Sequence, residues 1–319
     1  MLFKPTRIRA SMAEKQKLVF IFGPTGVGKT ELSIRVAEGI GEIISVDSMQ
    51  VYQGLELGTA KPEERALESI PHHLVSVVAP DYRFSAGDFR RMAIAAIEKV
   101  RERGMTPILV GGTGLYFRAL EYNLSEAPKA DPGLREELYR AEERKRGSLH
   151  NRLTAVDPET AHTLHPNDLI RIVRALEIYE LSGMRFSEFK ERNTASPFTI
   201  LKVGLMIDRV QLYRKLEQRC MRMINNGLPG EVYGLLKRGC DERYPSMKGL
   251  GYSHFMQYFK GCLSYAETVR LFVRDTRRYA KRQFTWFRNE SNVNWYSPDE
   301  YGKIRERIVE FLKNRVVQD

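Results

Sequence analysis

The segment Lys17–Thr30, KLVFIFGPTGVGKT, constrains the fold of this chain more than any other. Its part Leu18–Phe22 is a continuous apolar run, which is typical of a strand buried on both faces. The next eight residues, Gly23–Thr30, match G-x-x-x-x-G-K-[ST] at every fixed position. A helix predicted over Glu31–Glu38 would present its positive N-terminus to an anion in this loop. The order strand, loop, helix predicts an α/β fold with a phosphate-binding loop.

The loop predicts a site for two or more linked phosphates. Glycines let its backbone turn tightly, so that successive N–H groups point at phosphate oxygens. Lys29 would add a positive charge at the terminal phosphate, and the Thr30 hydroxyl suits Mg²⁺. A glycine-rich turn without a ligand is the alternative, and the loop leaves open which molecule carries the phosphates. The predicted phosphate-binding residues are Gly23, Pro24, Thr25, Gly26, Val27, Gly28, Lys29 and Thr30.

Strands and helices alternate after the loop. Strands are predicted at Glu42–Val46, Leu74–Val78 and Ile108–Val110. A helix is predicted to begin at Ser85, with a capping box, and to end near Gly104. This alternation indicates a parallel sheet covered by helices, in which ligands bind at the carboxyl ends of the strands.

Two of these strands end in residues that suit a ligand site: Asp47 and Ser48 follow Glu42–Val46, and Gly112 and Thr113 follow Ile108–Val110. A carboxylate beside a phosphate site can bind Mg²⁺ or accept a proton from a nucleophile. The alternative is that Asp47 only stabilises a turn. The strand before Gly112 lacks the Asp with which a motor-type NTPase would hold Mg²⁺, so NTP hydrolysis is disfavoured.

Residues 123–195 lack strand patterns and form a predicted all-helical insertion. It would divide a core made of residues 1–122 and 196–319, and it is either a solvated subdomain or a clamp for a large substrate. The predicted helices of the insertion are Asp131 to Gly147, a short helix from Asp157-Pro158, and Leu169–Leu181 with Asn167 as N-cap and Gly183 at its end.

The last part of the chain is basic. A strand is predicted at Thr199–Ile207, and a helix from Asp208 to about Asn226 contains Arg219, which could reach a phosphate or simply be solvated. A long helix, Tyr265–Asn289, places four cations on one face, with aromatic side chains interleaved among further cations. Such a face favours nucleic acid over mere solvation. The four are Arg270, Arg274, Arg277 and Lys281, and the further cations are Arg278, Arg282 and Arg288.

Composition narrows the class of protein. The 319 residues carry a net charge of +11, which predicts a polyanionic partner. The three cysteines are too far apart for a C-x-x-C site and too few for a disulfide framework, so reduced thiols and a cytoplasmic location are expected. No apolar run is long enough for a membrane span, and Met1–Lys17 lacks the apolar region of a signal peptide.

The combined motifs resemble the tRNA dimethylallyltransferase family, in the order that the family has them. One departure is Gly26-Val27, where many members have Ala-Ser, but neither residue supplies a catalytic group. The Cys/His set of the zinc finger that some members carry is not found in these residues, so the sequence resembles the compact bacterial form. The matching pieces are GPTGVGKT (Gly23–Thr30), ISVDSMQVY (Ile44–Tyr52), GTAKP (Gly58–Pro62), LVGGTGLY (Leu109–Tyr116), HPND (His165–Asp168), RALE (Arg174–Glu177), GLGY (Gly249–Tyr252) and AKRQFTWFR (Ala280–Arg288).

The resemblance implies a P-loop kinase-like core with a helical insertion. It further implies that dimethylallyl diphosphate occupies the loop with Mg²⁺, and that the group is transferred to N6 of adenosine 37 in tRNAs reading codons that begin with U. Asp47 would be the general base, and Thr30, Arg219 and Arg135 would lie near the diphosphate. The implied tRNA contacts, on the anticodon arm, are Asp47, Ser48, Met49, Gln50, Thr113, Arg135, Ile170, Arg171, Ile172, Val173, Arg174, Lys248, Gly249, Leu250, Gly251, Tyr252, Ser253, Lys281, Arg282, Gln283, Phe284, Thr285, Trp286, Phe287 and Arg288.

Two other functions share some of these features. A small-molecule or polynucleotide kinase also has the loop and an Asp after the second strand, but it would need an adenine site and an arginine-rich lid. A non-catalytic RNA-binding protein would have no use for an intact Lys29-Thr30 with Asp47. A transferase that works as a monomer is therefore the preferred interpretation.

Overall fold

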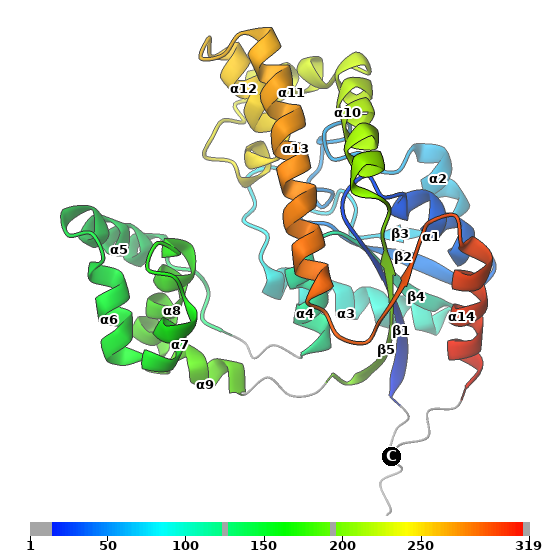
Figure 1. The fold of residues 1–319 in the computed structure, drawn as a ribbon, viewed down its shortest axis with the longest axis horizontal. Helices are drawn as coiled ribbons and strands as arrows, with labels where there is room; N and C mark the ends of the chain where they lie inside the picture. Colours follow the sequence, from blue (N-terminus) through cyan, green and yellow to red (C-terminus); the bar gives the residue numbers. More distant parts are fainter. Residues whose placement is uncertain (1–14, 123–126, 192–195, 315–319) are drawn as a thin grey trace, which may run out of the picture. The chain divides into compact units, whose positions relative to one another are not determined.

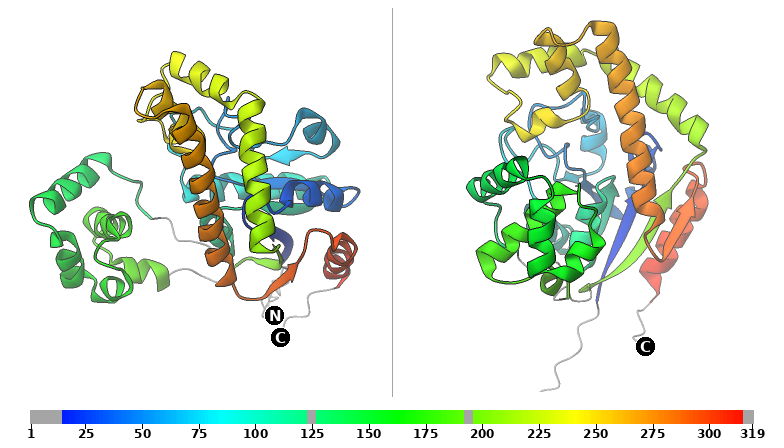
Figure 2. Two further views of the ribbon diagram at one scale, coloured as in Figure 1. Left: turned by 45° about the horizontal axis from the view of Figure 1, so that its top comes forward. Right: turned by 60° about the vertical axis from the view of Figure 1, so that its left-hand side comes forward.

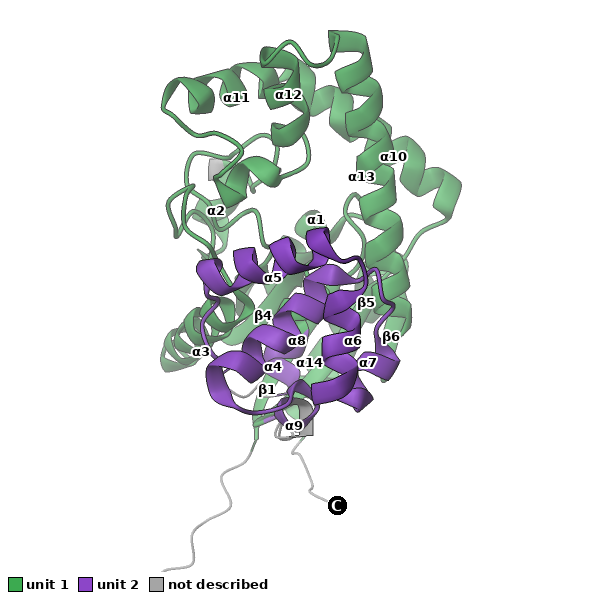
Figure 3. Cartoon of the chain, turned by 90° about the vertical axis from the view of Figure 1, so that its left-hand side faces the viewer, with its two compact units in different colours: residues 1–117, 197–319 green, residues 118–196 purple. Residues whose placement is uncertain are grey.

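The computed structural model describes residues 15–122, 127–191 and 196–314. They belong to two compact units: unit 1 comprises residues 1–117 and 197–319, and unit 2 comprises residues 118–196 (Figure 3). The predicted helical insertion, residues 123–195, lies within unit 2. The expected tail Met1–Lys17 falls almost wholly outside the described residues.

Unit 1 is built on one six-stranded sheet in the order β3-β2-β4-β1-β5-β6, and each neighbouring pair is parallel (Figure 1). In the register of the neighbouring strands β2, β4 and β1, Phe22 of β1 lies beside Gly111 of β4, and Gly111 lies beside Val46 of β2. These three strands therefore end at one level. The strands are β1 (Gln16–Phe22), β2 (Gly41–Val46), β3 (His72–His73), β4 (Thr106–Gly111), β5 (Phe198–Leu205) and β6 (Val293–Tyr296).

The prediction of a strand at Leu74–Val78 is wrong. The strand that pairs with β2 is the two-residue β3, and Leu74 and Ser76 have positive φ angles of 61° and 53°, which an extended strand does not tolerate. The backbone N–H groups of Ser76 to Val78 instead donate to the carbonyl oxygens of Gln50 and Val51. The turn after β2 therefore takes the hydrogen bonds that a longer strand would have used.

Helices cover both faces of the sheet, because successive side chains of a strand point in opposite directions (Figure 2). Val19 and Ile21 pack in a buried cluster with α1 and α14. Phe20 and Phe22 face the other way, where Phe117 of α4 and Phe287 of α13 lie against them with ring centroids 4.9 and 4.6 Å apart. These faces are covered by α1 (Lys29–Ala37), α3 (Ala86–Glu102), α4 (Gly114–Glu121), which belongs to unit 1 as far as Phe117, α14 (Tyr301–Lys313) and the end of α13 (Tyr265–Arg288). Helix α10 (Arg209–Asn225) packs against α13.

Most of the predicted helix starts are confirmed. Ser85 and Asp88 form the expected capping box of α3, and Asp208 caps α10 by accepting from the backbone N–H groups of Val210 and Gln211. The sequence patterns did not predict several short elements. Some of these contribute apolar residues to a second buried cluster around Met247, and α2 was missed as well. The missed elements include α2 (Glu64–Ser69), α4, α9 (Phe186–Glu191), α11 (Leu228–Lys237), the 3-10 turn η1 (Pro245–Lys248) and α12 (Tyr252–Phe259).

Unit 2 is helical, as predicted, with two local corrections. The helix expected from Asp131 to Gly147 ends at Arg144, and Gly147 with φ 84° precedes a separate helix. Asp168, rather than Asn167, caps α8, because its carboxylate accepts from the Arg171 backbone N–H. The helices, which enclose their own apolar core, are α5 (Pro132–Arg144), α6 (Ser148–Val156), α7 (Pro158–Thr163), α8 (Leu169–Ser182) and α9 (Phe186–Glu191).

Glu177 is the ionic centre of unit 2. Its carboxylate is fully buried and accepts hydrogen bonds from Arg135, Arg174 and the Asp131 backbone N–H. Burial opposes its ionisation, but the two guanidinium groups and the amide outweigh that effect and lower the pKa of Glu177 below its ordinary value of 4.5. The carboxylate thus fixes the start of α5 against α8.

Glu177→Gln is expected to lower the free energy of unfolding of unit 2 by about 3 kcal/mol at neutral pH, because it breaks a buried ion pair on one side. Since the folded-state pKa is lowered, this contribution is present above pH 4.5 and is lost as the pH falls through the folded-state value. Hydrogen exchange of unit 2 at neutral and acid pH measures both effects. Glu180→Gln, which removes a surface pair with Arg152, is the control and should cost less than about 1 kcal/mol. Equal costs for the two variants would contradict the role of Glu177.

Candidate active site at the strand ends

The loop after β1 has the backbone geometry that the sequence predicts. Gly26 and Gly28 have φ angles of 80° and 110°, and α1 begins directly after Gly28. A Cβ at Gly26 would lie 2.6 Å from Leu216 of α10, so the loop packs too closely for a side chain at that position. The ammonium of Lys29 donates to the carbonyl oxygens of Gly23 and Pro24 at 3.0 and 2.9 Å. The side chain therefore lies across the loop.

Two cations and one carboxylate meet beside this loop. The pKa of Lys29 is lowered to about 7 by burial and, secondly, by the positive charge of Arg219, while the negative charge of Asp47 opposes both effects. Burial likewise lowers the pKa of Arg219, again with Asp47 opposing. The structure thus brings together Lys29, Arg219 and Asp47 from α1, α10 and the end of β2. The resulting surplus of positive charge suits an anion.

Asp47 is held in place by its own turn. Its Oδ1 accepts from the backbone N–H groups of Met49 at 2.8 Å and Gln50 at 3.3 Å. Both bonds use one carboxylate oxygen, so the turn role leaves the second oxygen for another partner. The pKa values of Tyr116 and Tyr279 are raised by burial and, in part, by the charge of Asp47. These two phenols therefore lie near the carboxylate, and the sequence analysis missed them as site residues.

The turn after β4 is tied to the turn that carries Asp47. The backbone N–H groups of Gly112 and Thr113 both donate to the Val46 carbonyl oxygen at 3.2 Å. The Thr113 hydroxyl oxygen accepts from the Ser48 backbone N–H at 3.1 Å. Thr113 and Ser48 are therefore at the site, as predicted, and stabilise each other's loops.

Gln50 and the segment Lys248–Ser253 are mostly structural. The Gln50 amide accepts from the Ser45 hydroxyl at 2.9 Å and donates to the Ala60 carbonyl oxygen at 3.3 Å, so both of its ends are engaged within the protein. Tyr252 is fully buried and hydrogen-bonds to Glu231, which corrects the expectation that its side chain contacts RNA. Within the predicted segment, Lys248 is exposed, Leu250 and Ser253 are half-buried, and Gly249 and Gly251 are buried, with Met49 lying against Gly249.

The end of α13 divides into an inner and an outer face. Phe287 is buried on Phe22, and Gln283 is only 7% exposed, so neither side chain is available to RNA, contrary to expectation. Phe284 and Trp286 are half-buried. The exposed side chains are Lys281, Arg282, Thr285 and Arg288.

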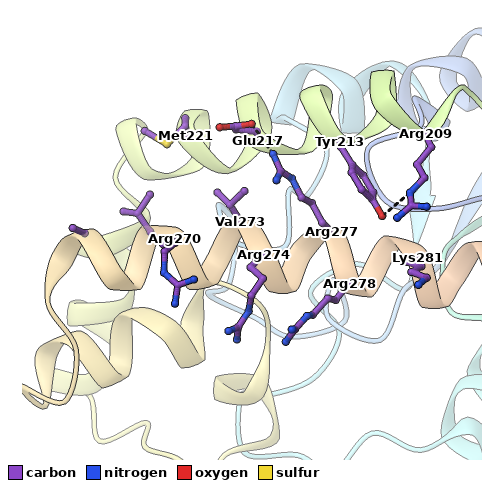
Figure 4. A pocket seen from close by; sticks show the side chains of 12 residues that line it. Arg209, Tyr213, Glu217, Met221, Arg270, Val273, Arg274, Arg277, Arg278 and Lys281 are labelled. Carbon is purple, nitrogen blue, oxygen red and sulfur yellow. Dashed lines mark hydrogen bonds and ion pairs between the residues drawn. The ribbon is translucent and has the colours of Figure 1, made fainter.

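A cationic groove of about 730 Å³ runs between α10 and α13 (Figure 4). Tyr213 lies between the guanidinium groups of Arg209 and Arg277, which are 5.1 and 5.7 Å from its ring centre. Arg277 also pairs with Glu217 at 2.7 Å. The lining residues are Arg209, Tyr213, Glu217, Met221, Ala266, Val269, Arg270, Val273, Arg274, Arg277, Arg278 and Lys281.

The basic helix is less uniform than its sequence suggests. Arg270 pairs with Glu267, Arg274 and Arg278 share Asp275, and Arg277 pairs with Glu217. Within the described ranges no ion pair involves Lys281, Arg282 or Arg288, and the last two lie over aromatic rings. The uncompensated charge is therefore concentrated in the last two turns of α13.

The predicted residues of unit 2 also separate into two groups. Ile172 and Val173 are buried in the core of this unit, so their side chains cannot contact RNA as expected. Ile170 and Arg171 on the same helix are exposed. Arg135 and Arg174 are about one-third exposed and bound to Glu177. A role for Arg135 at the diphosphate stays a prediction.

Two searches of the described residues bear on cofactors and membranes. Groups of three or more His, Cys, Asp and Glu side chains that could hold a metal ion do not occur among them. None of the helices in these ranges has the length and apolarity needed to cross a membrane.

Comparison with known proteins identifies the family. The model of the family described as IPP transferase matches residues 50–290. The chain belongs to the IPP transferase family. The tRNA dimethylallyltransferase 2 of Geotalea uraniireducens is 46% identical over 304 residues, which cover 94% of this chain and 98% of that protein. The tRNA dimethylallyltransferase of Geobacter sulfurreducens is 45% identical over 303 residues, covering 93% and 97%.

Solved structures of IPP transferases agree with this fold. The full-length tRNA isopentenylpyrophosphate transferase of Bacillus halodurans is 38% identical with a TM-score of 0.70, and the match covers 94% of this chain and 97% of that one. A eukaryotic dimethylallyltransferase acting on tRNA is 27% identical with a TM-score of 0.81, covering 95% and 81%. The predicted α/β class with a P-loop-like core is thereby confirmed.

Removing a positive and removing a negative neighbour should shift the pKa of Lys29 in opposite directions. Arg219→Met removes a neighbouring positive charge and is expected to raise this pKa above about 7, whereas Asp47→Asn removes a negative charge and is expected to lower it. An NMR titration of the methyl-labelled lysines of each variant measures the change. Asp81→Asn, at an exposed carboxylate, is the control and should leave the value unchanged. Shifts of the same sign in both variants would contradict the arrangement of the three charges.

Proposed function

We propose that the protein transfers a dimethylallyl group from dimethylallyl diphosphate to N6 of adenosine 37 in tRNAs reading codons that begin with U. The observation that carries the proposal is the surplus of positive charge of Lys29 and Arg219, both half-buried and both interacting electrostatically with Asp47, which follows β2. The names of the relatives, tRNA dimethylallyltransferases, support a dimethylallyl group as the transferred group and tRNA as the acceptor.

The donor's diphosphate would bind in the loop. Backbone N–H groups and the N-terminus of α1 supply fixed positive ends, and Lys29 and Arg219 supply charge. The exposed hydroxyl of Thr30, in the first turn of α1, fits a role in holding Mg²⁺ together with the diphosphate oxygens. When bound, Mg²⁺ would neutralise part of the charge on the leaving group.

In the reaction, the C1–O bond of the donor breaks and its electron pair leaves with diphosphate. The adenine N6 forms a bond to C1 and loses a proton, for which Asp47 is the proposed acceptor. Lys29 and Arg219 would stabilise the charge that develops on the diphosphate, which is the usual largest contribution in such sites. Tyr116 and Tyr279, near Asp47, would help to exclude water from the carboxylate.

The acceptor adenine must leave the stack of the anticodon loop to reach this carboxylate, which costs a few kcal/mol. Contacts with the RNA backbone would offset this free-energy cost. The exposed cations Lys281, Arg282 and Arg288 on α13 and Arg171 on α8 are the proposed contacts to the anticodon arm. We also propose that the protein is a monomer. We further propose a cytoplasmic location, which the free cysteine residues favour.

Asp47→Asn is expected to slow transfer by about 10² to 10⁴, the loss typical of a missing general base, while both substrates stay bound. Single-turnover assays with purified tRNA and labelled dimethylallyl diphosphate measure the rate, and parallel assays with labelled ATP test the kinase alternative. Asp81→Asn, at an exposed carboxylate, serves as the control. A near-normal rate for Asp47→Asn would exclude its role, and phosphate transfer from ATP without dimethylallyl transfer would overturn the proposed function.

The two ends of α13 should differ in RNA binding. Lys281→Ala with Arg282→Ala is expected to lower the slope of log affinity against log salt by roughly one unit or less per lost phosphate contact. Arg270→Ala with Arg274→Ala removes equal charge, but these arginines are already paired with Glu267 and Asp275, so the slope should change less. Salt series of tRNA binding decide between the pairs. A larger change in slope for Arg270→Ala with Arg274→Ala would instead place the RNA-binding surface in the groove between α10 and α13.

A further inference from the structure

The side-chain amide of Gln283 connects two loops of the site. It lies on the inner face of α13 and is 7% exposed, whereas Lys281 and Arg282 beside it are exposed. Its Oε1 accepts from the Thr25 backbone N–H at 2.8 Å, and its Nε2 donates to the Gly112 carbonyl oxygen at 2.9 Å. One side chain thus bridges the phosphate loop and the turn after β4.

The surroundings leave little room for Gln283 to move. A Cβ at Gly112 would lie 2.3 Å from Gln283 Nε2, and a Cβ at Gly114 would lie 2.1 Å from the Trp286 ring nitrogen. One turn further along α13, Phe287 stacks on Phe22 at 4.6 Å, directly before the phosphate loop. The end of α13 is therefore docked at three points on the ends of β1 and β4.

The bridge extends to the proposed base. Gly112 and Thr113 donate to the Val46 carbonyl oxygen, and Thr113 accepts from Ser48, so the turn held by Gln283 is bonded to both neighbours of Asp47 in the chain. A shift of Gly112 would consequently move Asp47 relative to Lys29 and the phosphate loop.

We propose that Gln283 is a positioning residue of the transfer reaction. Its amide sets the distance between the loop that binds the donor and the turn whose carboxylate takes the proton of the acceptor. This assignment rests on the proposed function, and it replaces the RNA contact that the family resemblance implies for this residue. Misplacement of reacting groups by about 1 Å can cost about 10²-fold in rate, so the bridge acts on turnover rather than on binding.

The first variant, Gln283→Leu, removes both hydrogen bonds at similar side-chain volume. Its kcat is expected to fall by about 10- to 100-fold, while the tRNA dissociation constant and the KM for dimethylallyl diphosphate change by less than about threefold. The matched control is Gln211→Leu, the same substitution at an exposed site in α10, which should leave kcat unchanged. Thermal unfolding of both variants reports on the fold.

The second variant, Gln283→Glu, keeps the acceptor for Thr25, but only its protonated form can donate to the Gly112 carbonyl oxygen. Its kcat relative to wild type is therefore expected to rise as the pH falls and the carboxyl group becomes protonated. The corresponding ratio for Gln283→Leu should stay flat. A residue that only fills space would not produce this difference, and the variant carries the test if the leucine variant does not fold.

Three results would overturn the assignment. They are a kcat of Gln283→Leu close to that of wild type, a loss confined to tRNA affinity, and a pH-independent ratio for Gln283→Glu. A wild-type protein that transfers no dimethylallyl group contradicts the proposed function itself, and that result is seen before any variant is compared.

Discussion

The desolvation of Lys29 and Arg219 beside the carboxylate of Asp47 is the interaction on which the candidate site depends. Desolvating two positive side chains costs free energy, and the single negative side chain of Asp47 offsets only part of it. The lowered pKa values of both cations are a consequence of this cost. An anion with more than one negative charge would offset it. The glycine loop and the start of α1 add backbone N–H groups at the same place, so the site is prepared for linked phosphates before any ligand arrives.

The sheet topology makes this concentration of charge possible. Because β2, β4 and β1 are neighbours and end at one level, the phosphate loop, the Asp47 turn and the Gly112 turn lie along one edge. Two later helices complete the site beyond the strand ends: α10 supplies Arg219, and α13 supplies Tyr279 and Gln283 (Figure 1). Residues that act together are thus more than 150 positions apart in the sequence.

That separation explains which features sequence reasoning could predict. The loop, the caps at Ser85 and Asp208 and the position of Asp47 depend on neighbours within a few residues, and the structure agrees with each. The strand expected at Leu74–Val78 failed because its hydrogen bonds go to the turn at Gln50 and Val51, which no local pattern reveals.

Long-range pairing also changed the reading of the charged residues. Arg277 pairs with Glu217 on another helix, and Arg135 of α5 pairs with Glu177 of α8, so cations that look free in the sequence are compensated in the fold. Gln283 resembled an RNA contact because of the motif that contains it, whereas its amide points to Thr25 and Gly112. The face that a helical residue presents is known only when the partners of the helix are known.

Calorimetric titration of inorganic diphosphate tests the central claim, that the two desolvated cations form the anion site. Wild type is expected to bind diphosphate, and Lys29→Met and Arg219→Met are each expected to weaken binding by about tenfold or more, which corresponds to ~1.4 kcal/mol. Lys281→Met, which removes an exposed cation outside the loop, should leave the affinity unchanged. Equal diphosphate affinity in wild type and Arg219→Met would contradict the claim.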